Sequence, residues 1–232
     1  MRRVMLVCLV TIGLAAPAFA QDKPVEINLG GGAIFPTGNF GSDFNAGGEF
    51  QIGATFWMPG NPHIGIEADY NYARMNGPDK QITVTPTPGG GVASTQLIQS
   101  NHQMHAGVFD IVGRSNNHDS MMNFYGLAGL GIYHRIIQLT SPAVGYTTIC
   151  DPYWLVCYPA AVSVDNILGS RSSNDFGINF GGGVEFGHEA KFFIEARYTA
   201  VFGGTVTPPA GVTVANTSTT VSYFPLMFGV KF

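Results

Sequence analysis

The 232-residue chain is rich in glycine and aromatic residues, with 31 Gly, 17 Phe and 9 Tyr, and only 11% of its residues are charged. Ordinary soluble proteins carry about 25% charged residues, so the composition is unusual for a soluble enzyme. The formal net charge is −4, and the sequence has no basic stripe. Both observations argue against a nucleic-acid partner.

The first residues have the pattern of a secretory signal peptide. Arg2 and Arg3 precede an apolar run over residues 4–16, and Ala18-Phe19-Ala20 forms a small-residue cleavage site. The run is too short for a membrane anchor helix, which needs about 20 apolar residues. We therefore predict a signal peptide over residues 1–20 and one domain over residues 21–232. Without the two arginines, 9 Lys and Arg face 15 Asp and Glu, a net charge of about −6.

Apolar and polar residues alternate along most of the remaining chain, as expected for β-strands with two different faces. The stretch 191–202 is typical: Phe192 and Ile194 share one face, while Lys191, Glu195 and Arg197 share the other. Two further stretches are strand-like but cannot be assigned faces, except that Asp110 and Arg135 are expected to point inward. The eight predicted strands lie near residues 27–35, 48–56, 63–72, 95–114, 121–139, 176–186, 191–202 and 224–232.

Strand and connection lengths favour a membrane barrel over a secreted β-sandwich. The alternating faces run for about nine to eleven residues, enough to cross a membrane at a tilt, whereas soluble strands average about five or six. Long and short connections also alternate, as in a barrel with tight periplasmic turns and longer outer loops. The short connections are 58–61, 115–119 and 187–189, and the long ones are 36–45, 75–94, 140–173 and 205–218. We predict an all-β, eight-stranded, antiparallel, up-and-down transmembrane β-barrel with short periplasmic turns and long extracellular loops.

The chain ends in alternating apolar residues with a terminal Phe, formed by Phe224, Phe228, Val230 and Phe232. This ending resembles the signal that the barrel assembly machinery reads in bacterial outer-membrane proteins. The whole mature chain is similar to the small eight-stranded outer-membrane β-barrel family that includes OmpX-like and OmpA-barrel-like proteins. The resemblance implies an integral protein of the bacterial outer membrane, surrounded by outer-membrane lipid and monomeric. It says little about activity, because one fold hosts many functions.

The inward face is expected to hold a polar network, because an eight-stranded barrel is just wide enough to be filled by its own side chains. Its charged members are Glu49, Glu67, Asp69, Glu185, Glu195 and Arg197. A buried charge needs a partner, so Arg197 should pair with one or more of Glu67, Asp69, Glu49 and Glu185. Such a network is either a stabilising plug or an ion gate.

Two cysteines, Cys150 and Cys157, lie close together in the third long connection. An exported protein folds in an oxidising compartment, which favours a disulfide between them. Tyr153, Trp154 and Tyr158 would then belong to a small stapled loop. That loop is either an exposed binding tip or a clip that keeps the connection ordered.

No residue set carries the spacing of a catalytic or cofactor site. Ser94, Ser100, His102 and Asp110 match no known catalytic signature, and His102 and His105 would fall on opposite faces of a strand. We therefore expect no enzyme activity, no cofactor and no metal. The leading hypothesis is a structural or surface-interaction protein that acts through its extracellular loops and a partner still to be identified. A narrow channel for small solutes is the alternative, and an envelope enzyme is a third.

Overall fold

Strands make up nearly all of the chain that the computed structural model describes, which covers residues 25–84, 94–116, 120–151, 156–188, 190–204 and 220–232. The predicted signal peptide and the predicted loop 205–218 lie outside these residues. No described helix combines the length and the apolar character that a membrane span requires. The elements are β1 (Val25–Thr37), α2 (Gly38–Asp43), β2 (Gly47–Met58), β3 (Asn61–Asn76), β4 (Lys80–Val84), β5 (Ser94–Arg114), β6 (Met122–Asp151), β7 (Val156–Gly187), β8 (Lys191–Phe202) and β9 (Val221–Lys231).

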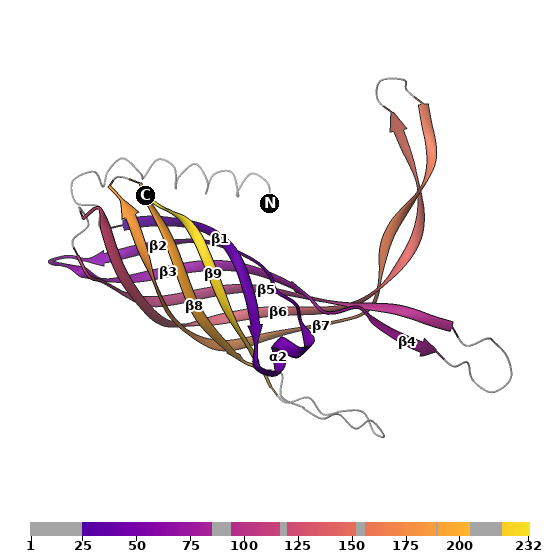
Figure 1. Cartoon of the computed structure of the whole chain (residues 1–232), viewed down its shortest axis with the longest axis horizontal. Helices are drawn as coiled ribbons and strands as arrows, with labels where there is room; N and C mark the ends of the chain where they lie inside the picture. The colour runs from indigo at the N-terminus through magenta and orange to yellow at the C-terminus, as the bar shows by residue number, and fades with distance from the viewer. Residues whose placement is uncertain (1–24, 85–93, 117–119, 152–155, 189, 205–219) are drawn as a thin grey trace, which may run out of the picture.

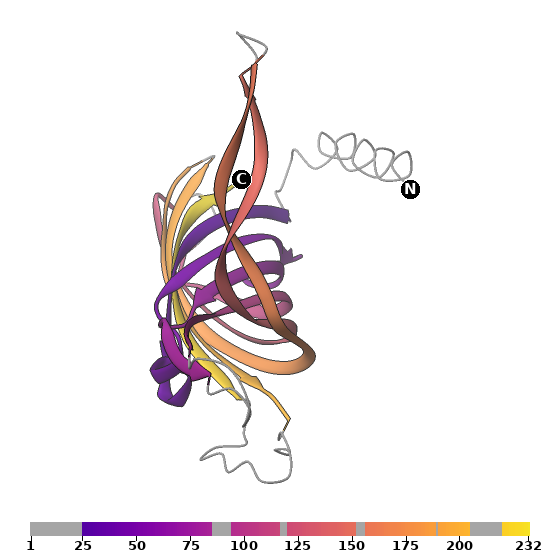
Figure 2. The same cartoon turned by 90° about the vertical axis from the view of Figure 1, so that its right-hand side faces the viewer.

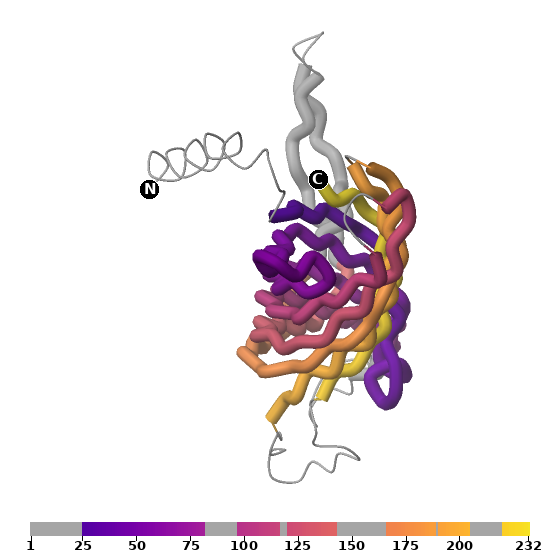
Figure 3. Tube along the Cα trace, turned by 90° about the vertical axis from the view of Figure 1, so that its left-hand side faces the viewer, coloured from indigo at the N-terminus to yellow at the C-terminus, as the bar shows by residue number. Residues whose placement is uncertain are grey.

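Eight of the strands form a closed antiparallel ring (Figures 1 and 3). Each strand pairs with its neighbour in sequence, β3 pairs directly with β5, and β1 pairs with β9 to close the ring. The short strand β4 stands outside the ring and pairs only with the first residues of β5. The predicted eight-stranded up-and-down barrel is confirmed, with β4 as an addition to it.

The strand register sets the tilt of the barrel. We start at Thr37 of β1 and step from each residue to its partner on the next strand. One full circuit of the ring ends at Ile27 of β1, ten residues from the start. The intermediate partners are Ser222, Ala200, Ile178, Leu130, Phe109, Ala68 and Ala54. With ordinary strand spacing and rise, a shift of ten over eight strands corresponds to a tilt of about 40°.

The two faces of the wall are sorted as the alternation predicts. Large apolar side chains such as Phe50, Phe192 and Phe228 are exposed on the outside. Polar side chains such as Gln51, Glu67 and Arg197 are buried inside. The structure also assigns the two strands whose faces the sequence left open. Even-numbered residues of β5 from His102 to Arg114, including Asp110, and odd-numbered residues of β6 from Asn123 to Arg135 face the lumen.

The prediction of a long loop over residues 140–173 is wrong, because β6 and β7 continue through it. Residues 141–151 of β6 and 156–166 of β7 pair only with each other among the described residues, and we call this two-stranded extension the arm. At about 3.3 Å per residue, eleven residues give the arm a length of about 35 Å. Figure 1 shows the arm leaving the end of the barrel, and Figure 2 shows its outer part extending past the barrel. The predicted loops 36–45 and 75–94 likewise contain α2 and β4.

The two ends of the barrel differ. Figure 1 places α2, β4 and the arm at one end, which we call the arm end, and the last residue of the chain at the other, which we call the turn end. The short connection between β2 and β3 turns at Gly60, whose φ of +81° suits glycine. Since membrane barrels carry their longer connections outside the cell, the arm end is the extracellular one.

Candidate functional site in the barrel lumen

Arg197 of β8 lies at the centre of the lumen among four carboxylates. Its Nη2 donates to Glu67 Oε1 at 2.9 Å, and its Nη1 donates to Asp110 Oδ2 at 3.0 Å. Both terminal nitrogens lie 3.1 Å from Asp69 Oδ2, and Nε donates to Glu195. Only 3% of the Arg197 side chain is exposed. We call these five residues the Arg197 cluster.

Neutral side chains add further hydrogen bonds to the carboxylates of the Arg197 cluster. Thr55 donates to Glu67 Oε2 at 2.6 Å, and Gln51 donates to Asp69 Oδ2 at 2.7 Å. Asn179 donates to Asp110 Oδ2 at 3.2 Å, and the Tyr125 hydroxyl donates to Glu195 Oε2 at 2.8 Å. These donors come from β2, β6 and β7, so the network ties opposite walls of the barrel together.

The predicted partners of Arg197 are brought together only in part. Glu67 and Asp69 are in contact with it, whereas Glu185 pairs with Lys191 and Lys231 instead. Glu49 faces the lumen but makes no ion pair with Arg197 among the described residues. Asp110 was expected inward but was not predicted to bind Arg197. The alternation of β5 gave its direction, but only the closed ring places it opposite β8.

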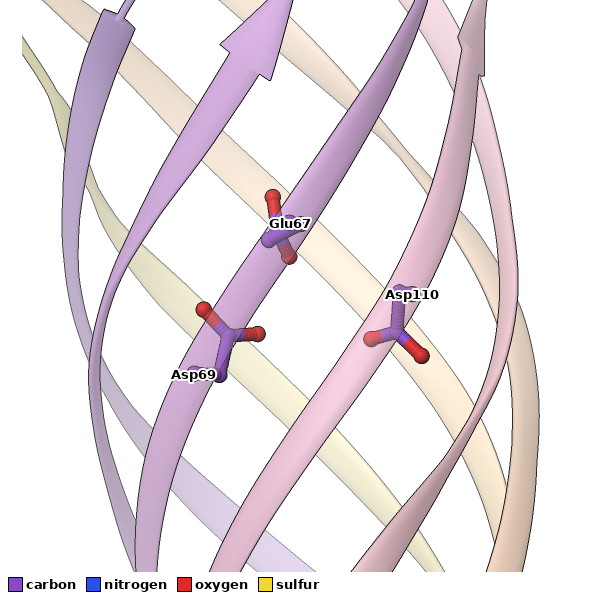
Figure 4. A group of neighbouring side chains, drawn as sticks. All are labelled: Glu67, Asp69 and Asp110. Atoms are coloured by element: carbon purple, nitrogen blue, oxygen red, sulfur yellow. The ribbon is translucent and has the colours of Figure 1, made fainter.

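The carboxylates of Glu67, Asp69 and Asp110 converge, with oxygens within 4.8 Å of one another (Figure 4). Carboxylate oxygens at this spacing resemble the ligands of a hard divalent cation. The Arg197 guanidinium, however, already bonds to all three groups. The geometry is therefore that of a charge network built around an arginine.

A second ionic layer closes the lumen at the turn end. Arg114 Nη1 lies 3.1 Å from Glu26 Oε1, and Lys191 Nζ lies 3.6 Å from the same oxygen. Lys191 also binds Glu185 at 3.1 Å. Lys231 Nζ lies 3.7 Å from Glu185 and 3.9 Å from Glu67, which links this layer to the Arg197 cluster. Glu26, Arg114 and Lys231 were not predicted as network members, although the alternation places Glu26 and Lys231 inward.

An apolar layer that the sequence did not predict fills the lumen at the arm end. Its members are fully buried and come from β1, β3, β5, β6, β8 and β9, with Phe40 of α2 above them. They are Ile34, Phe40, Ala73, Met75, Met104, Ala106, Val108, Tyr133, Val201, Val221 and Tyr223. A second buried apolar cluster packs beside the ionic layer at the turn end: Trp57, Val112, Tyr125, Leu127, Phe193 and Met227. Ionic and apolar side chains thus fill the lumen along its axis, which is the arrangement of a plug.

His102 lies at the top of the apolar layer and is fully buried. Its ring packs against Phe40 and Phe44, with centroid distances of 5.2 and 5.4 Å. Neither ring nitrogen has a hydrogen-bond partner among the described residues. His105, by contrast, faces outward and accepts or donates a 2.7 Å bond with Tyr70, so the two histidines lie on opposite faces as predicted.

Replacing His102 with Leu should stabilise the barrel. A buried polar group without a partner costs about 1–3 kcal/mol, and Leu removes that cost while keeping a similar volume. We expect the free energy of unfolding, measured by urea titration of the protein in lipid vesicles, to rise by about that amount. The control His134→Leu should bring no such gain, because His134 bonds to Asn174 on the outer face. A destabilised His102→Leu variant would contradict the assignment.

The remaining predicted site residues lie at the surface or outside the described part. Cys150 and Cys157 are backbone partners in the ladder of the arm. Their side chains, that of Tyr158, and all of Tyr153 and Trp154 lie outside the described residues, so the disulfide and the binding tip stay predictions. Phe224, Phe228, Val230 and Phe232 face outward as part of the apolar wall. Their role as an assembly signal also stays a prediction.

A closed ring with an apolar exterior and a filled polar interior defines an integral β-barrel membrane protein. Residues 6–232 match the family described as outer membrane protein beta-barrel domain. The chain belongs to this family, and it is an integral protein of the bacterial outer membrane.

Several solved structures are similar to the chain. Ail, the attachment invasion locus protein of Yersinia pestis, in complex with the heparin analogue sucrose octasulfate, shares 15% identity over 90% of this chain and 96% of its own, with a TM-score of 0.40. Neisserial surface protein A shares 12% identity over 90% and 96%, with a TM-score of 0.45. The Escherichia coli outer membrane protease OmpT shares 14% identity over 82% and 64%, with a TM-score of 0.41. No curated protein sequence matches the chain.

Proposed function

We propose that the protein acts at the cell surface as an interaction protein, with the barrel as a closed anchor and the arm as the contacting element. The observation that carries this proposal is the β6–β7 ladder, which continues for eleven residue pairs beyond the last pairing of β6 with β5. A two-stranded ladder that stands alone in water is only marginally stable. An extension of this length therefore adds little to the stability of the barrel. We infer that it serves to contact a partner.

The arm presents unpaired backbone at its strand edges. Among the described residues, β6 has no second partner strand after Thr140, and β7 has none before Phe176. Unpaired strand edges can accept an extended segment of another chain. The arm therefore supports a protein partner that binds by strand addition, outside the outer leaflet.

The filled lumen argues against the alternative of a narrow channel. A conducting path must be continuous, and here the Arg197 cluster, the ionic layer at the turn end and the apolar layer occupy the lumen in series. The expectation that the protein catalyses no reaction remains a prediction from the sequence.

A variant without the arm tests the proposal. Residues 143–164 can be replaced by Asn-Gly, because Pro142 and Asp165 are paired and Asn-Gly forms the tight turn that such a pair needs. Bacteria that display the intact protein should adhere to at least one surface in a panel of immobilised matrix proteins, glycans and second bacterial cells. The armless variant should lose that adhesion while keeping its heat-dependent gel mobility. Equal adhesion by the armless variant would overturn the proposal.

A further inference from the structure

The outer wall of the barrel carries a groove over β2 and β3, near the arm end. Its volume is about 670 Å³, and Gly48, Phe50, Tyr72, Arg74 and Asn76 are among the residues that line it. These five are outward-facing positions, so the groove opens on the outer face of the wall. Its lining also includes Gly32, Gly47 and the buried Glu49, whose positions belong to the lumen side. It is separate from the Arg197 cluster and from the arm.

The groove exists because a glycine interrupts the apolar side chains of β2. Gly48 pairs with Arg74 across the ladder, and Phe50 pairs with Tyr72 one step below. A Cβ at Gly48 would come no closer than 3.8 Å to any other atom, so the site has room for a side chain that the sequence does not supply. The floor is therefore bare backbone, and the two aromatic rings flank it on the membrane side.

The groove crosses the upper boundary of the apolar wall. On β3 the outward residues change from Tyr70 and Tyr72 to Arg74. Neighbouring strands change at the same place: Gly107 is followed outward by His105, and His105, His134 and Asn174 are successive ladder partners of Tyr72. Below this row the outward residues of these strands are mostly apolar, and above it they are mostly polar, with Ile136 of β6 as an exception. Arg74 thus lies at the level where acyl chains end and lipid headgroups begin.

Arg74 places a positive charge at this boundary that no described residue neutralises. Its side chain is exposed, and it makes no ion pair or side-chain hydrogen bond with any described residue. The acidic residues of β2 and β3 that lie near it in sequence, Glu49 and Asp69, are buried on the lumen side of the wall. A guanidinium in this position can bind a phosphate through two parallel hydrogen bonds.

We propose that the groove binds one phosphorylated lipid of the outer leaflet. One acyl chain lies over Gly48 against Phe50 and Tyr72, and the lipid phosphate binds the Arg74 guanidinium. Both halves of the site are needed: the glycine floor accepts the chain, and the arginine selects the charge. The site acts independently of whatever the arm contacts.

Lipid binding to the refolded, full-length mature barrel tests this proposal. Native mass spectrometry in detergent counts bound molecules of bis-phosphorylated lipid A, of the same lipid after enzymatic dephosphorylation, and of phosphatidylethanolamine. The wild type should retain one bis-phosphorylated lipid A more tightly than the other two lipids. Inorganic phosphate should not displace it, because a free anion lacks the acyl chain that fills the groove.

Matched variants separate the two halves of the site. Arg74→Gln should weaken binding of the phosphorylated lipid by about tenfold, the loss expected for a charge-assisted hydrogen bond, and leave the dephosphorylated lipid unaffected. Gly48→Leu should fill the groove and weaken both. The control Gly107→Leu, also outward-facing with nothing within 4 Å of an added Cβ, should change neither. All variants must show the heat-dependent mobility of a folded barrel.

Three results would overturn the proposal. Unchanged binding of the phosphorylated lipid by Arg74→Gln would remove the arginine from the site. Equal weakening by Gly107→Leu and Gly48→Leu would mean that lipids coat the wall without a particular groove. Displacement by inorganic phosphate alone would reduce the site to a surface anion contact.

Discussion

Replacing Arg197 with Met should lower the free energy of unfolding of the barrel by roughly 3–5 kcal/mol. The substitution removes the guanidinium and leaves the carboxylates of Glu67, Asp69, Asp110 and Glu195 facing one another in the lumen. Removing one partner of a buried ion pair lowers the free energy of unfolding by this amount, because the remaining charges lose their partner and are not rehydrated. Urea titration of the vesicle-inserted protein, followed by tryptophan fluorescence, measures the change.

Two further variants make this result specific. Arg171→Met removes an arginine whose side chain is exposed and should change stability by no more than about 0.5 kcal/mol. Combining Arg197→Met with Asp69→Asn and Asp110→Asn should restore part of the loss, because amides can bond to each other without a cation. If Arg197→Met and Arg171→Met were equally mild, the Arg197 cluster would not hold the barrel together.

Replacing Tyr223 with Ala should cost roughly 3–5 kcal/mol, as expected for truncation of a large buried ring. Tyr223 is 1% exposed and lies in the apolar layer at the arm end. The conservative variant Tyr223→Phe keeps the ring and should stay within about 1.5 kcal/mol of the wild type, the usual worth of one hydrogen bond. The same urea titration compares the two.

The Tyr223→Ala variant also tests whether the apolar layer is a gate. In a planar bilayer we expect no steady current from the wild type and none from Tyr223→Ala, because the Arg197 cluster closes the lumen below the cavity. Discrete openings in the wild type would contradict the closed lumen. Openings in Tyr223→Ala alone would make the apolar layer the only barrier to ions.

The sequence predicts the wall of the barrel better than its contents. In strands such as β2 and β8, apolar residues face outward and polar residues face inward, so the period of two is clear. In β5 and β6 the inward residues include Met104, Val108 and Tyr133, which are as apolar as the outward ones. The alternation disappears there, and this is why both the faces of these strands and the apolar layer escaped prediction.

The arm and the cluster partners escaped prediction for different reasons. The arm extends beyond the paired wall of the barrel, so neither the membrane nor a core imposes an alternating sequence pattern on its two strands. The partners of Arg197 depend on which strands lie opposite each other across the lumen. Glu67 and Asp69 could be chosen as acids on an inward face, but Asp110 required the closed ring.

The separation of the cluster along the chain has a consequence for how the barrel reaches the membrane. Arg197 meets Glu67, Asp69 and Asp110 across 130, 128 and 87 residues, so these three acids belong to the first half of the chain, whereas Arg197 and Glu195 belong to its second-last strand. A growing sheet of the early strands exposes three carboxylates that lipid would solvate poorly. The free energy of such a sheet does not fall when it enters the bilayer without β8. Insertion is favoured only when β8 has arrived, which couples membrane entry to completion of the polypeptide.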